Sequence, residues 1–255
     1  MSHKRKKMKI TYLSDVHCEF HRDKGKSFVR FLANFAIEEG VEAIIIAGDF
    51  ATHNIYVERY SELCSLAKGI EVVAVNGNHE LYASNRGVLN NNKVKLEKRF
   101  SNLHILDKEV FEFKGQRFLG ATLWFRNHPE NPFYERHLND FFSIQGFDKW
   151  VYPENAACIK FFEDNMKEGD ICISHHAPSA ICIRPEFKHA IGMNRFYVTD
   201  LTNLIFERQP AVFVNGHLHS QFEEYLGQTK MLCNPHGYVG HELRSQEFEF
   251  VVLEV

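Results

Sequence analysis

Five short strand-like runs in this chain are each followed at once by residues that can bind a metal ion. The runs are KITYLS, EAIIIAG, IEVVAVNG, DICIS and AVFVNG, at residues 9–14, 42–48, 70–77, 170–174 and 211–216. Continuous apolar runs of four to eight residues bounded by turn residues are typical of strands buried on both faces. The chain is therefore expected to build its fold around an internal, largely parallel sheet.

Helical segments separate these strands in the first half of the chain. Residues 26–39 have helical periodicity and end at Gly40, and residues 55–68 read as a second helix before Gly69. Glycine after a helix is a common C-terminal cap. The resulting β-α-β-α-β order predicts a parallel α/β sheet.

The second half of the chain is richer in strands and predicts a second, mixed sheet packed on the first. A hairpin is expected around Lys114-Gly115, with helices at 154–167 and 200–207. Further strands are expected at 222–226, 230–234 and 247–255. Because no proline- or glycine-rich linker divides the chain, we expect a single domain over residues 1–255.

Composition restricts the class of protein. Hydrophobic residues make up 44% and charged residues 25%, as in a globular protein with a core. The sequence contains no run of 18 apolar residues, so no membrane-spanning helix is expected. Residues 1–8 read as a disordered basic tail. The net charge of −3 and the lack of a later Lys/Arg cluster argue against binding to extended nucleic acid. Six scattered cysteines without CxxC predict reduced thiols and a cytoplasmic protein.

The residues that follow the five strands share a chemical character. They are Asp15 and His17, Asp49, Asn78 with His79 and Glu80, His175 with His176, and His217 with His219. Each group alone has an ordinary explanation as a cap, a turn or a surface histidine. Ligands of open α/β sheets bind beyond the carboxyl ends of the strands, so these five groups should converge on one rim.

The types of side chain indicate which ions would bind there. A mixture of imidazole, carboxylate and amide oxygen suits Mn²⁺, Fe or Zn²⁺ better than Mg²⁺, which prefers oxygen alone. Seven candidate ligands are too many for one ion and sufficient for two that share a carboxylate. Asp49 stands alone on a central strand and is the natural bridge.

The five motifs, read as SDVH, AGDF, NGNHE, SHHAP and NGHLH, resemble the motif series of the calcineurin-like metallophosphoesterase superfamily. The resemblance extends from Asp15 to His219, and all five motifs are intact. It implies a four-layer α/β sandwich of two mixed sheets flanked by helices. It also implies a dinuclear, metal-dependent phosphoester hydrolase in which a hydroxide bridging the two ions is the nucleophile.

The resemblance also assigns the ligands. One ion would be held by Asp15, His17, Asp49 and His219, and the other by Asp49, Asn78, His175 and His217. In SHHAP the family places its ligand first, so His176 is expected to support the ligands or line a pocket. The histidines of NGHLH would each serve a different ion, which accounts for their spacing.

His79 corresponds to the catalytic histidine of the family, which is not a ligand. It would face the leaving-group oxygen and donate a proton or stabilise the developing charge. With Asp49, the bridging ligand, it forms the expected catalytic pair. Glu80 is expected to be structural or orienting.

Two departures from the family's serine/threonine protein phosphatases bear on the substrate. Those enzymes extend the second motif to GDxVDRG and carry arginine just before GNHE, whereas this chain has GDFATHN and Asn76. It thereby lacks an aspartate partner for the catalytic histidine and a phosphate-holding arginine. A phosphodiester carries less charge than a monoester, so we expect a phosphodiesterase, with a nucleotide among the candidate substrates. A phosphomonoesterase or protein phosphatase, a nuclease of the same fold and a non-catalytic scaffold remain alternatives.

Three segments are candidates for contact with substrate. Residues 126–152 are aromatic-rich and irregular, which fits a lip over a pocket as well as a surface excursion. The segment after SHHAP carries polar side chains that could grip a substrate, namely Arg184, Lys188, His189, Asn194 and Arg195. NPHGY, residues 234–238, is either a turn near the metal rim or a plain strand exit.

Overall fold

The computed structural model describes residues 7–255, so most of the basic tail expected at residues 1–8 lies outside the described residues. The first sheet contains β1 (Lys9–Leu13), β2 (Ala43–Ala47), β3 (Glu71–Val75), β4 (Leu103–Ile105) and β11 (Val252–Glu254). The strand order is β11-β1-β2-β3-β4. Strands β1 to β4 are parallel, and β11 pairs with β1 in the antiparallel sense.

The second sheet is also mixed. Its strands are β5 (Glu109–Phe113), β6 (Gln116–Ala121), β7 (Ile171–Ser174), β8 (Val212–Val214), β9 (Phe222–Leu226) and β10 (Thr229–Cys233). They lie in the order β5-β6-β7-β8-β10-β9. The inner strands β6, β7, β8 and β10 are parallel, while β5 and β9 form antiparallel edges.

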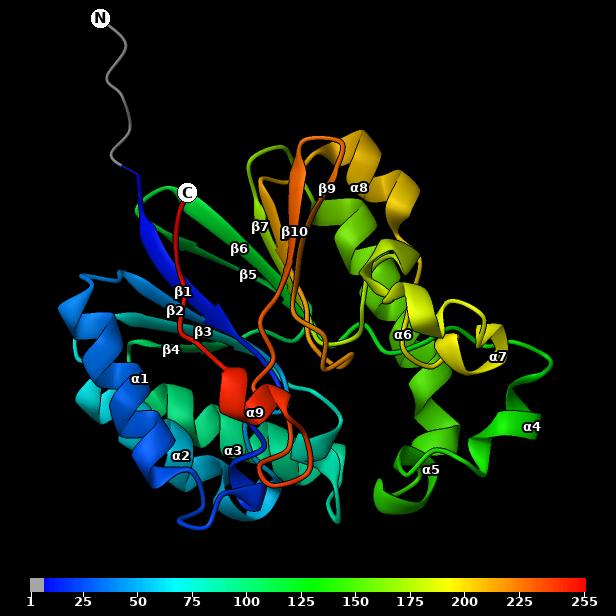
Figure 1. The fold of residues 1–255 in the computed structure, drawn as a ribbon, viewed down its shortest axis with the longest axis horizontal. Coiled ribbons are helices and arrows are strands. Elements are labelled where there is room, and N and C mark those ends of the chain that lie inside the picture. The colour runs from blue at the N-terminus through cyan, green and yellow to red at the C-terminus, as the bar shows by residue number, and fades with distance from the viewer. Residues whose placement is uncertain (1–6) are drawn as a thin grey trace, which may run out of the picture.

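Helices cover the outer faces of both sheets (Figure 1). The first sheet is covered by α1 (Lys26–Glu38), α2 (His53–Leu66) and α3 (Arg86–Arg99), and the second by α6 (Phe147–Asn165) and α8 (Thr202–Arg208). This arrangement is the four-layer sandwich expected from the sequence. Among residues 7–255, no helix is both long and apolar enough to cross a membrane.

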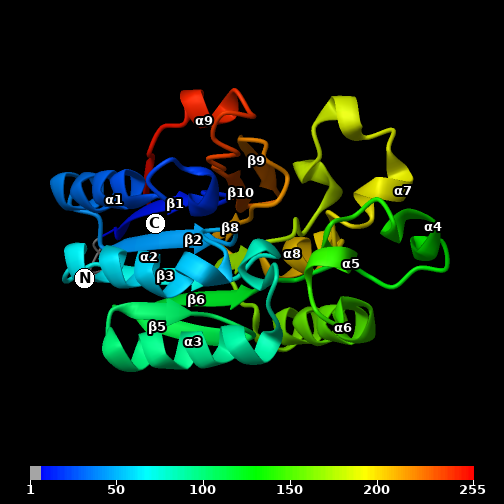
Figure 2. The same ribbon diagram turned by 90° about the horizontal axis from the view of Figure 1, so that it is seen from below.

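Shorter elements lie outside these layers. They are the 3₁₀ helices η1 (Cys18–Phe20), η2 (His79–Leu81), η3 (Ala180–Cys182) and η4 (Pro185–Phe187), and the helices α4 (Asn131–Glu135), α5 (Asp140–Ser143), α7 (Ile191–Asn194) and α9 (Arg244–Glu247). Figure 2 shows α4, α5 and α7 together at one end of the molecule. The segment 126–152 therefore forms a side lobe with the segment that contains α7.

The core lies in the layers between the sheets and under the helices. Ile45 and Val73 of the first sheet share one buried cluster with Ile173 and Val214 of the second. Every residue of β2 is buried, as its uninterrupted apolar run predicts for a central parallel strand. The six cysteines are free and buried, in agreement with reduced thiols.

Three local expectations differ from the structure. The strand expected at 247–255 is reduced to β11, because residue 247 ends α9 and residues 248–251 have no regular structure. Helix α6 begins at Phe147 rather than at residue 154, because it continues through Pro153, a residue that more often starts or breaks a helix. Helix α3 was not expected at all. Its buried face combines Leu89 and Leu96 with Lys93, whose ammonium pairs with Glu109 at 2.5 Å, so the face has little apolar periodicity.

Candidate metal centre

The carboxyl ends of β1, β2, β3, β7 and β8 bring all five motifs to one place between the two sheets (Figure 1). The backbone leaves the strands in an unusual conformation there. Positive φ angles, which non-glycine residues rarely adopt, occur at Asp15, His17, Asp49, His217 and His219, with values from 48° to 69°. Such strain persists where the surrounding structure enforces it, and it turns these side chains toward a common point.

One group of side chains consists of Asp15, His17 and His219, whose ligand atoms all lie within 4.8 Å of one another. The Nε2 atoms of His17 and His219 are 3.1 Å apart, and Oδ1 of Asp15 is 3.5 Å from Nε2 of His219. Two nitrogens bound to one tetrahedral ion at about 2.0 Å would be separated by about 3.3 Å. The spacing of these atoms therefore fits a shared metal ion.

A second group consists of Asp49, His175 and His217, again within 4.8 Å. Oδ1 of Asn78 lies 3.0 Å from Nε2 of His175, so the amide oxygen joins this group. The carboxylate of Asp49 lies between the two groups. Its Oδ2 is 3.4 Å from Nε2 of His175 and 3.8 Å from Nε2 of His17. The structure thus brings together all seven side chains that the sequence nominated.

Burial sets the charge state of these groups. Burial alone would raise the pKa of Asp49, but the nearby imidazoles of His175, His79 and His17 hold it well below its usual range. Burial lowers the pKa of His175, and Asp49 more than offsets this and raises it to about 9. For His219, Asp15 and Glu242 outweigh burial and raise the pKa to about 10. The carboxylates are ready to bind a cation, which would have to displace protons from these two histidines.

Further hydrogen bonds hold the ligands in place from behind. Nδ1 of His175 donates to the carbonyl oxygen of Ala47 at 2.9 Å, and Nδ1 of His219 donates to the Glu242 carboxylate at 2.8 Å. The Nδ2 group of Asn78 donates to Oδ1 of Asp140 at 2.8 Å, which leaves the amide oxygen facing His175. Such partners fix the orientation and basicity of metal ligands.

Asp140 and Glu242 were not found from the sequence, because neither lies at a strand end. Asp140 belongs to α5 in the irregular segment 126–152, and it also accepts a hydrogen bond from the hydroxyl of Tyr82 at 2.7 Å. Glu242 follows NPHGY in a loop without a regular element. Segment 126–152 therefore reaches the ligand Asn78 directly.

His79 lies beside this cluster with both ring nitrogens in contact with polar groups. Its Nδ1 lies 3.0 Å from Oε1 of Glu19, and its Nε2 lies 3.2 Å from the hydroxyl of Tyr238. Its backbone N–H donates to Oδ1 of Asp49 at 2.9 Å. Burial lowers the pKa of His79, but Asp49 and Glu19 together raise it above its usual value.

Glu19 supplies the acidic partner that the second motif lacks. It stands two residues after His17 in SDVHCE, so the only available signal was a carboxylate close to the first motif. Burial would raise its pKa, but the nearby imidazole of His17, 3.5 Å away, and the hydrogen bond from His79 lower the pKa to about 2. His79 therefore has a carboxylate partner, although the chain lacks the aspartate that the protein phosphatases carry in the second motif.

Glu80 has the structural position that was expected. Its carboxylate accepts hydrogen bonds from the backbone N–H groups of Phe50 and Gly77, each at 2.7 Å, and of Asp49 at 3.1 Å. It therefore ties the loop after β2 to the loop after β3. Burial, followed by the repulsion of Asp49, raises its pKa to about 8.

NPHGY forms a turn at the metal rim. Pro235 makes an isolated parallel bridge with Ser14, and the Tyr238 ring lies 4.3 Å from that of His17 and 4.7 Å from that of His219. Of the two open alternatives for this segment, the structure shows the first. Tyr238 covers one side of the cluster.

His176 is fully buried behind the candidate ligands. Its ring lies 4.2 Å from that of His217 and 5.2 Å from that of Trp124. Burial, together with the neighbouring His175, lowers its pKa to about 3, so it is neutral. It supports His217 by packing.

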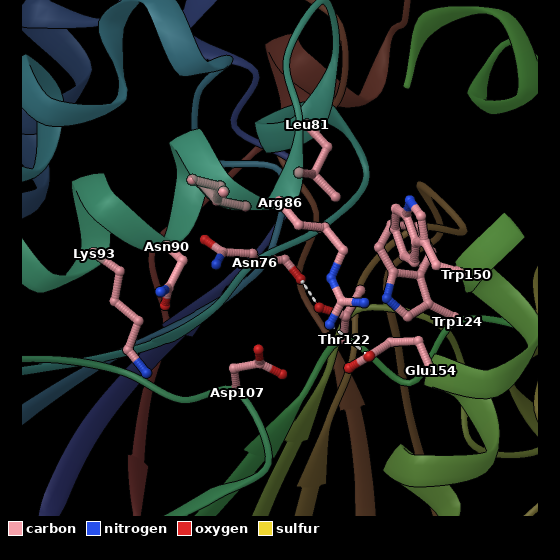
Figure 3. Close-up of a pocket in the computed structure, with 13 residues that line it drawn as sticks. Asn76, Leu81, Arg86, Asn90, Lys93, Asp107, Thr122, Trp124, Trp150 and Glu154 are labelled. Atoms are coloured by element: carbon pink, nitrogen blue, oxygen red, sulfur yellow. Dashed lines mark hydrogen bonds and ion pairs between the residues drawn. The ribbon is translucent and has the colours of Figure 1, made fainter. Parts of the chain in front are cut away.

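Asn76, which replaces the arginine of the protein phosphatases, faces away from the ligands. Its Oδ1 accepts a hydrogen bond from Tyr56, and it lines a separate cavity of about 360 Å³ together with Trp124 and Trp150 (Figure 3). Of the charged side chains there, Arg86 and Glu154 form an ion pair at 2.6 Å, while Lys93 and Asp107 pair with Glu109 and Lys108 outside the lining. None of the seven candidate ligands lines this cavity.

The five polar candidates after SHHAP divide into two groups. Arg184 and Asn194 line a groove beside His217 and His219. Lys188 and His189 are exposed outside that lining, and Arg195 pairs with Glu130 and His128 of the side lobe.

Comparison with known proteins gives a consistent result. The sequence matches the family model of the calcineurin-like phosphoesterases over residues 8–221. It is 23% identical, over an alignment of 243 positions, to an uncharacterized protein of Acanthamoeba polyphaga mimivirus, covering 82% of this chain and 84% of that protein.

Two solved structures share the fold. One is the phosphopantetheinyl hydrolase of Mycobacterium tuberculosis, with a TM-score of 0.68, 16% identity, and coverage of 98% of this chain and 96% of that one. The other is a dimetal phosphatase from Danio rerio, with a TM-score of 0.57, 13% identity, and coverage of 97% and 92%.

Proposed function

Because this chain belongs to the calcineurin-like phosphoesterase family, as its five motifs predicted, we propose that it is a dinuclear metal-dependent phosphodiesterase. The observation that carries this proposal is the position of Asp49. One of its carboxylate oxygens lies within 3.8 Å of a histidine nitrogen in each of the two ligand groups. A single carboxylate in that position is suited to bridging two ions.

The proposed ligand sets follow the two groups. Asp15, His17 and His219 hold one ion, Asn78, His175 and His217 hold the other, and Asp49 serves both. Imidazole nitrogens outnumber carboxylate oxygens, which supports Mn²⁺, Fe or Zn²⁺ rather than Mg²⁺. Two ions bound here would supply a nucleophile by lowering the pKa of water and would neutralise the phosphoryl oxygens.

The protein's own contribution to the reaction is proton transfer and orientation. The bond from phosphorus to the attacking water oxygen forms as the bond to the leaving oxygen breaks, and that oxygen then needs a proton. His79 can supply one from Nε2, since Glu19 holds the opposite nitrogen and the raised pKa favours the protonated ring. Glu80 holds the loops that carry Asp49 and His79 together.

Preference for a diester is supported by the absence of a cationic side chain at position 76. Asn76 is bonded to Tyr56 and faces the separate cavity of Figure 3, so it offers no charge to a dianionic monoester. A monoesterase or protein phosphatase is therefore the second candidate function. A nuclease would need free cations along its groove. A non-catalytic scaffold would tolerate the loss of metal ligands, whereas this chain retains all seven candidate ligands and His79.

The test compares a methyl p-nitrophenyl phosphate diester with p-nitrophenyl phosphate, which share a leaving group. Each is assayed with Mn²⁺ and with chelator, and bound metal is counted by mass spectrometry. We expect two ions per chain and Mn²⁺-dependent turnover that favours the diester. Preference for the monoester would replace the phosphodiesterase proposal, and no turnover of either with two ions bound would revive the scaffold reading.

A further inference from the structure

A long groove runs beside the proposed metal centre. One part, of about 350 Å³, has a lining that includes Phe187, Met193, Asn194, Tyr197 and Leu218. A second part, of about 680 Å³, has a lining that includes His219, Glu242 and Leu243. The two parts adjoin, because Arg184, Phe187, Leu218 and Ser220 line both.

The groove reaches the proposed ligands at two points. His219 and its partner Glu242 line the larger part. In the smaller part, Tyr197 stacks against His217 with ring centroids 4.9 Å apart, and Leu218 stands between the two histidines in sequence. A molecule that binds its phosphoryl group at the metal centre could therefore extend its remaining atoms into this groove.

The far part of the groove is apolar. Ile183, Phe187, Met193, Tyr197 and Leu218 form most of its lining. Phe187 is 51% exposed, and Leu243 at the other part is 73% exposed. Exposed apolar side chains that gather around a concave site of this size are typical of ligand pockets.

The two arginines and the asparagine of the groove have partners within the protein. Arg184 pairs with Glu186 at 3.3 Å and lies over the Phe187 ring, and Arg244 donates to Oδ1 of Asn234 at 2.7 Å. The Nδ2 group of Asn194 donates to the Phe187 carbonyl at 2.9 Å. The cations that a phosphate backbone would need are therefore already paired in this groove.

The side lobe supports the wall of this groove. Helices α4 and α7 pack together, and Gly192 of α7 lies so close to Tyr134 that an added Cβ would be 2.3 Å from its ring. Arg195 forms an ion pair with Glu130, which connects the same two segments. Segment 126–152 thereby holds the 183–197 wall in position.

We propose that this groove binds the organic part of the phosphoester substrate, and that this part is an apolar alkyl or aryl group. The inference rests on the proposed function only in placing the phosphoryl group at the metal centre. It assigns Phe187, Met193, Tyr197 and Leu218 as the residues that select the substrate. The attraction is the removal of hydrocarbon from water, which grows with each methylene that is buried.

The experiment measures binding of phosphonates to the Mn²⁺-loaded protein by calorimetry, so it does not depend on turnover. The monomethyl esters of methylphosphonate, hexylphosphonate and phenylphosphonate, named below by the phosphonate alone, carry the single charge of a diester and present the same head group with organic groups of different size. We expect the dissociation constant to fall at least tenfold, a rough figure for several buried methylenes, from the methyl to the hexyl compound. The methyl ester of thymidine 5′-monophosphate, likewise named below without its ester group, serves as the nucleotide comparison.

Variants localise the effect. In Phe187→Ala and Met193→Ala the ratio of methyl to hexyl dissociation constants should approach one. Phe133→Ala is the matched control, because Phe133 is 71% exposed on the same side lobe but lines neither part of the groove. That variant should keep the wild-type ratio.

Three results would overturn the inference. They are equal affinities for methyl and hexyl phosphonate, no measurable binding of hexylphosphonate, and tighter binding of thymidine 5′-monophosphate than of hexylphosphonate. If the diester above is hydrolysed while the phosphonates show no size preference, the groove inference fails and the phosphodiesterase proposal stands. If hexylphosphonate is preferred but no ester is hydrolysed, the proposed reaction fails and the groove inference stands.

Discussion

The proposed site is built from two kinds of residue, which differ in how the fold holds them in position. The seven proposed ligands, called strand-end ligands below, follow the carboxyl ends of sheet strands. Four loop partners, Glu19, Asp140, Tyr238 and Glu242, come from turns, short helices and irregular segments. The ligands sit on a scaffold of buried hydrogen-bonded strands, whereas the partners depend on the packing of individual segments. The sheets thus position the proposed ligands, and the loops position the residues that adjust the orientation and pKa of those side chains.

The largest effect is expected for Asp49→Asn, because it changes the one strand-end ligand shared by both groups. Asparagine keeps the size of the side chain but cannot carry the bridging charge. Turnover of the diester should fall roughly 10⁴-fold, since a bound metal stabilises the transition state by several kcal/mol. Fewer than two Mn²⁺ ions should bind per chain. The control is His137→Ala, an exposed side-lobe histidine, and two bound ions in the Asp49 variant would contradict the bridging role.

His79→Ala should lower kcat by roughly 10³-fold, within the range of general acid catalysis, and leave the metal content at two ions. This outcome would distinguish the role of His79 in catalysis from the role of the proposed ligands in metal binding, although His79 and the ligands all follow strands. The measurement is kcat beside metal stoichiometry. Loss of metal in this variant would place His79 among the ligands.

The strand-end ligands could be predicted because a parallel strand has a recognisable sequence and a fixed end. The run AIIIA predicts β2, and the end of β2 places Asp49 beside whatever follows β1 and β3. The loop partners could not be predicted in this way. Asp140 meets Asn78 because α5 folds back against the segment after β3, where the backbone of Ala83 and Ser84 pairs with that of residues 143–145.

Metal affinity should rise steeply with pH, because two of the strand-end histidines hold protons before an ion binds. The pKa of His175 is raised to about 9 and that of His219 to about 10, so both are protonated at pH 7 and must lose a proton to bind metal. Each displaced proton makes affinity about tenfold higher per pH unit. Two protons therefore give about 100-fold between pH 7 and 8. Calorimetry in buffers of different ionisation enthalpy measures the proton release, and binding without it would contradict the assignment.

Asp140→Ala tests whether a loop partner adjusts a strand-end ligand. Removing the carboxylate frees the Asn78 amide to rotate, so Mn²⁺ affinity should fall roughly 10- to 100-fold, as for other partners of metal ligands. Asp148→Ala is the matched control, because Asp148 is exposed in the same segment. An unchanged affinity in Asp140→Ala would mean that segment 126–152 serves the groove alone.

The smallest effect on kcat is expected for Glu19→Gln. This variant tests what Glu19, the loop partner of His79, contributes to catalysis. Glutamine can still accept the hydrogen bond from Nδ1 but carries no charge, whereas alanine removes both. If Glu19 acts mainly by orienting the ring, kcat should fall roughly threefold in Glu19→Gln and at least tenfold in Glu19→Ala, with KM little changed. Equal losses in the two variants would show that the negative charge on Glu19, which helps to raise the pKa of His79, is the main contribution. The high-pH limb of the kcat profile distinguishes the cases, because loss of charge lowers that pKa and moves the limb to lower pH.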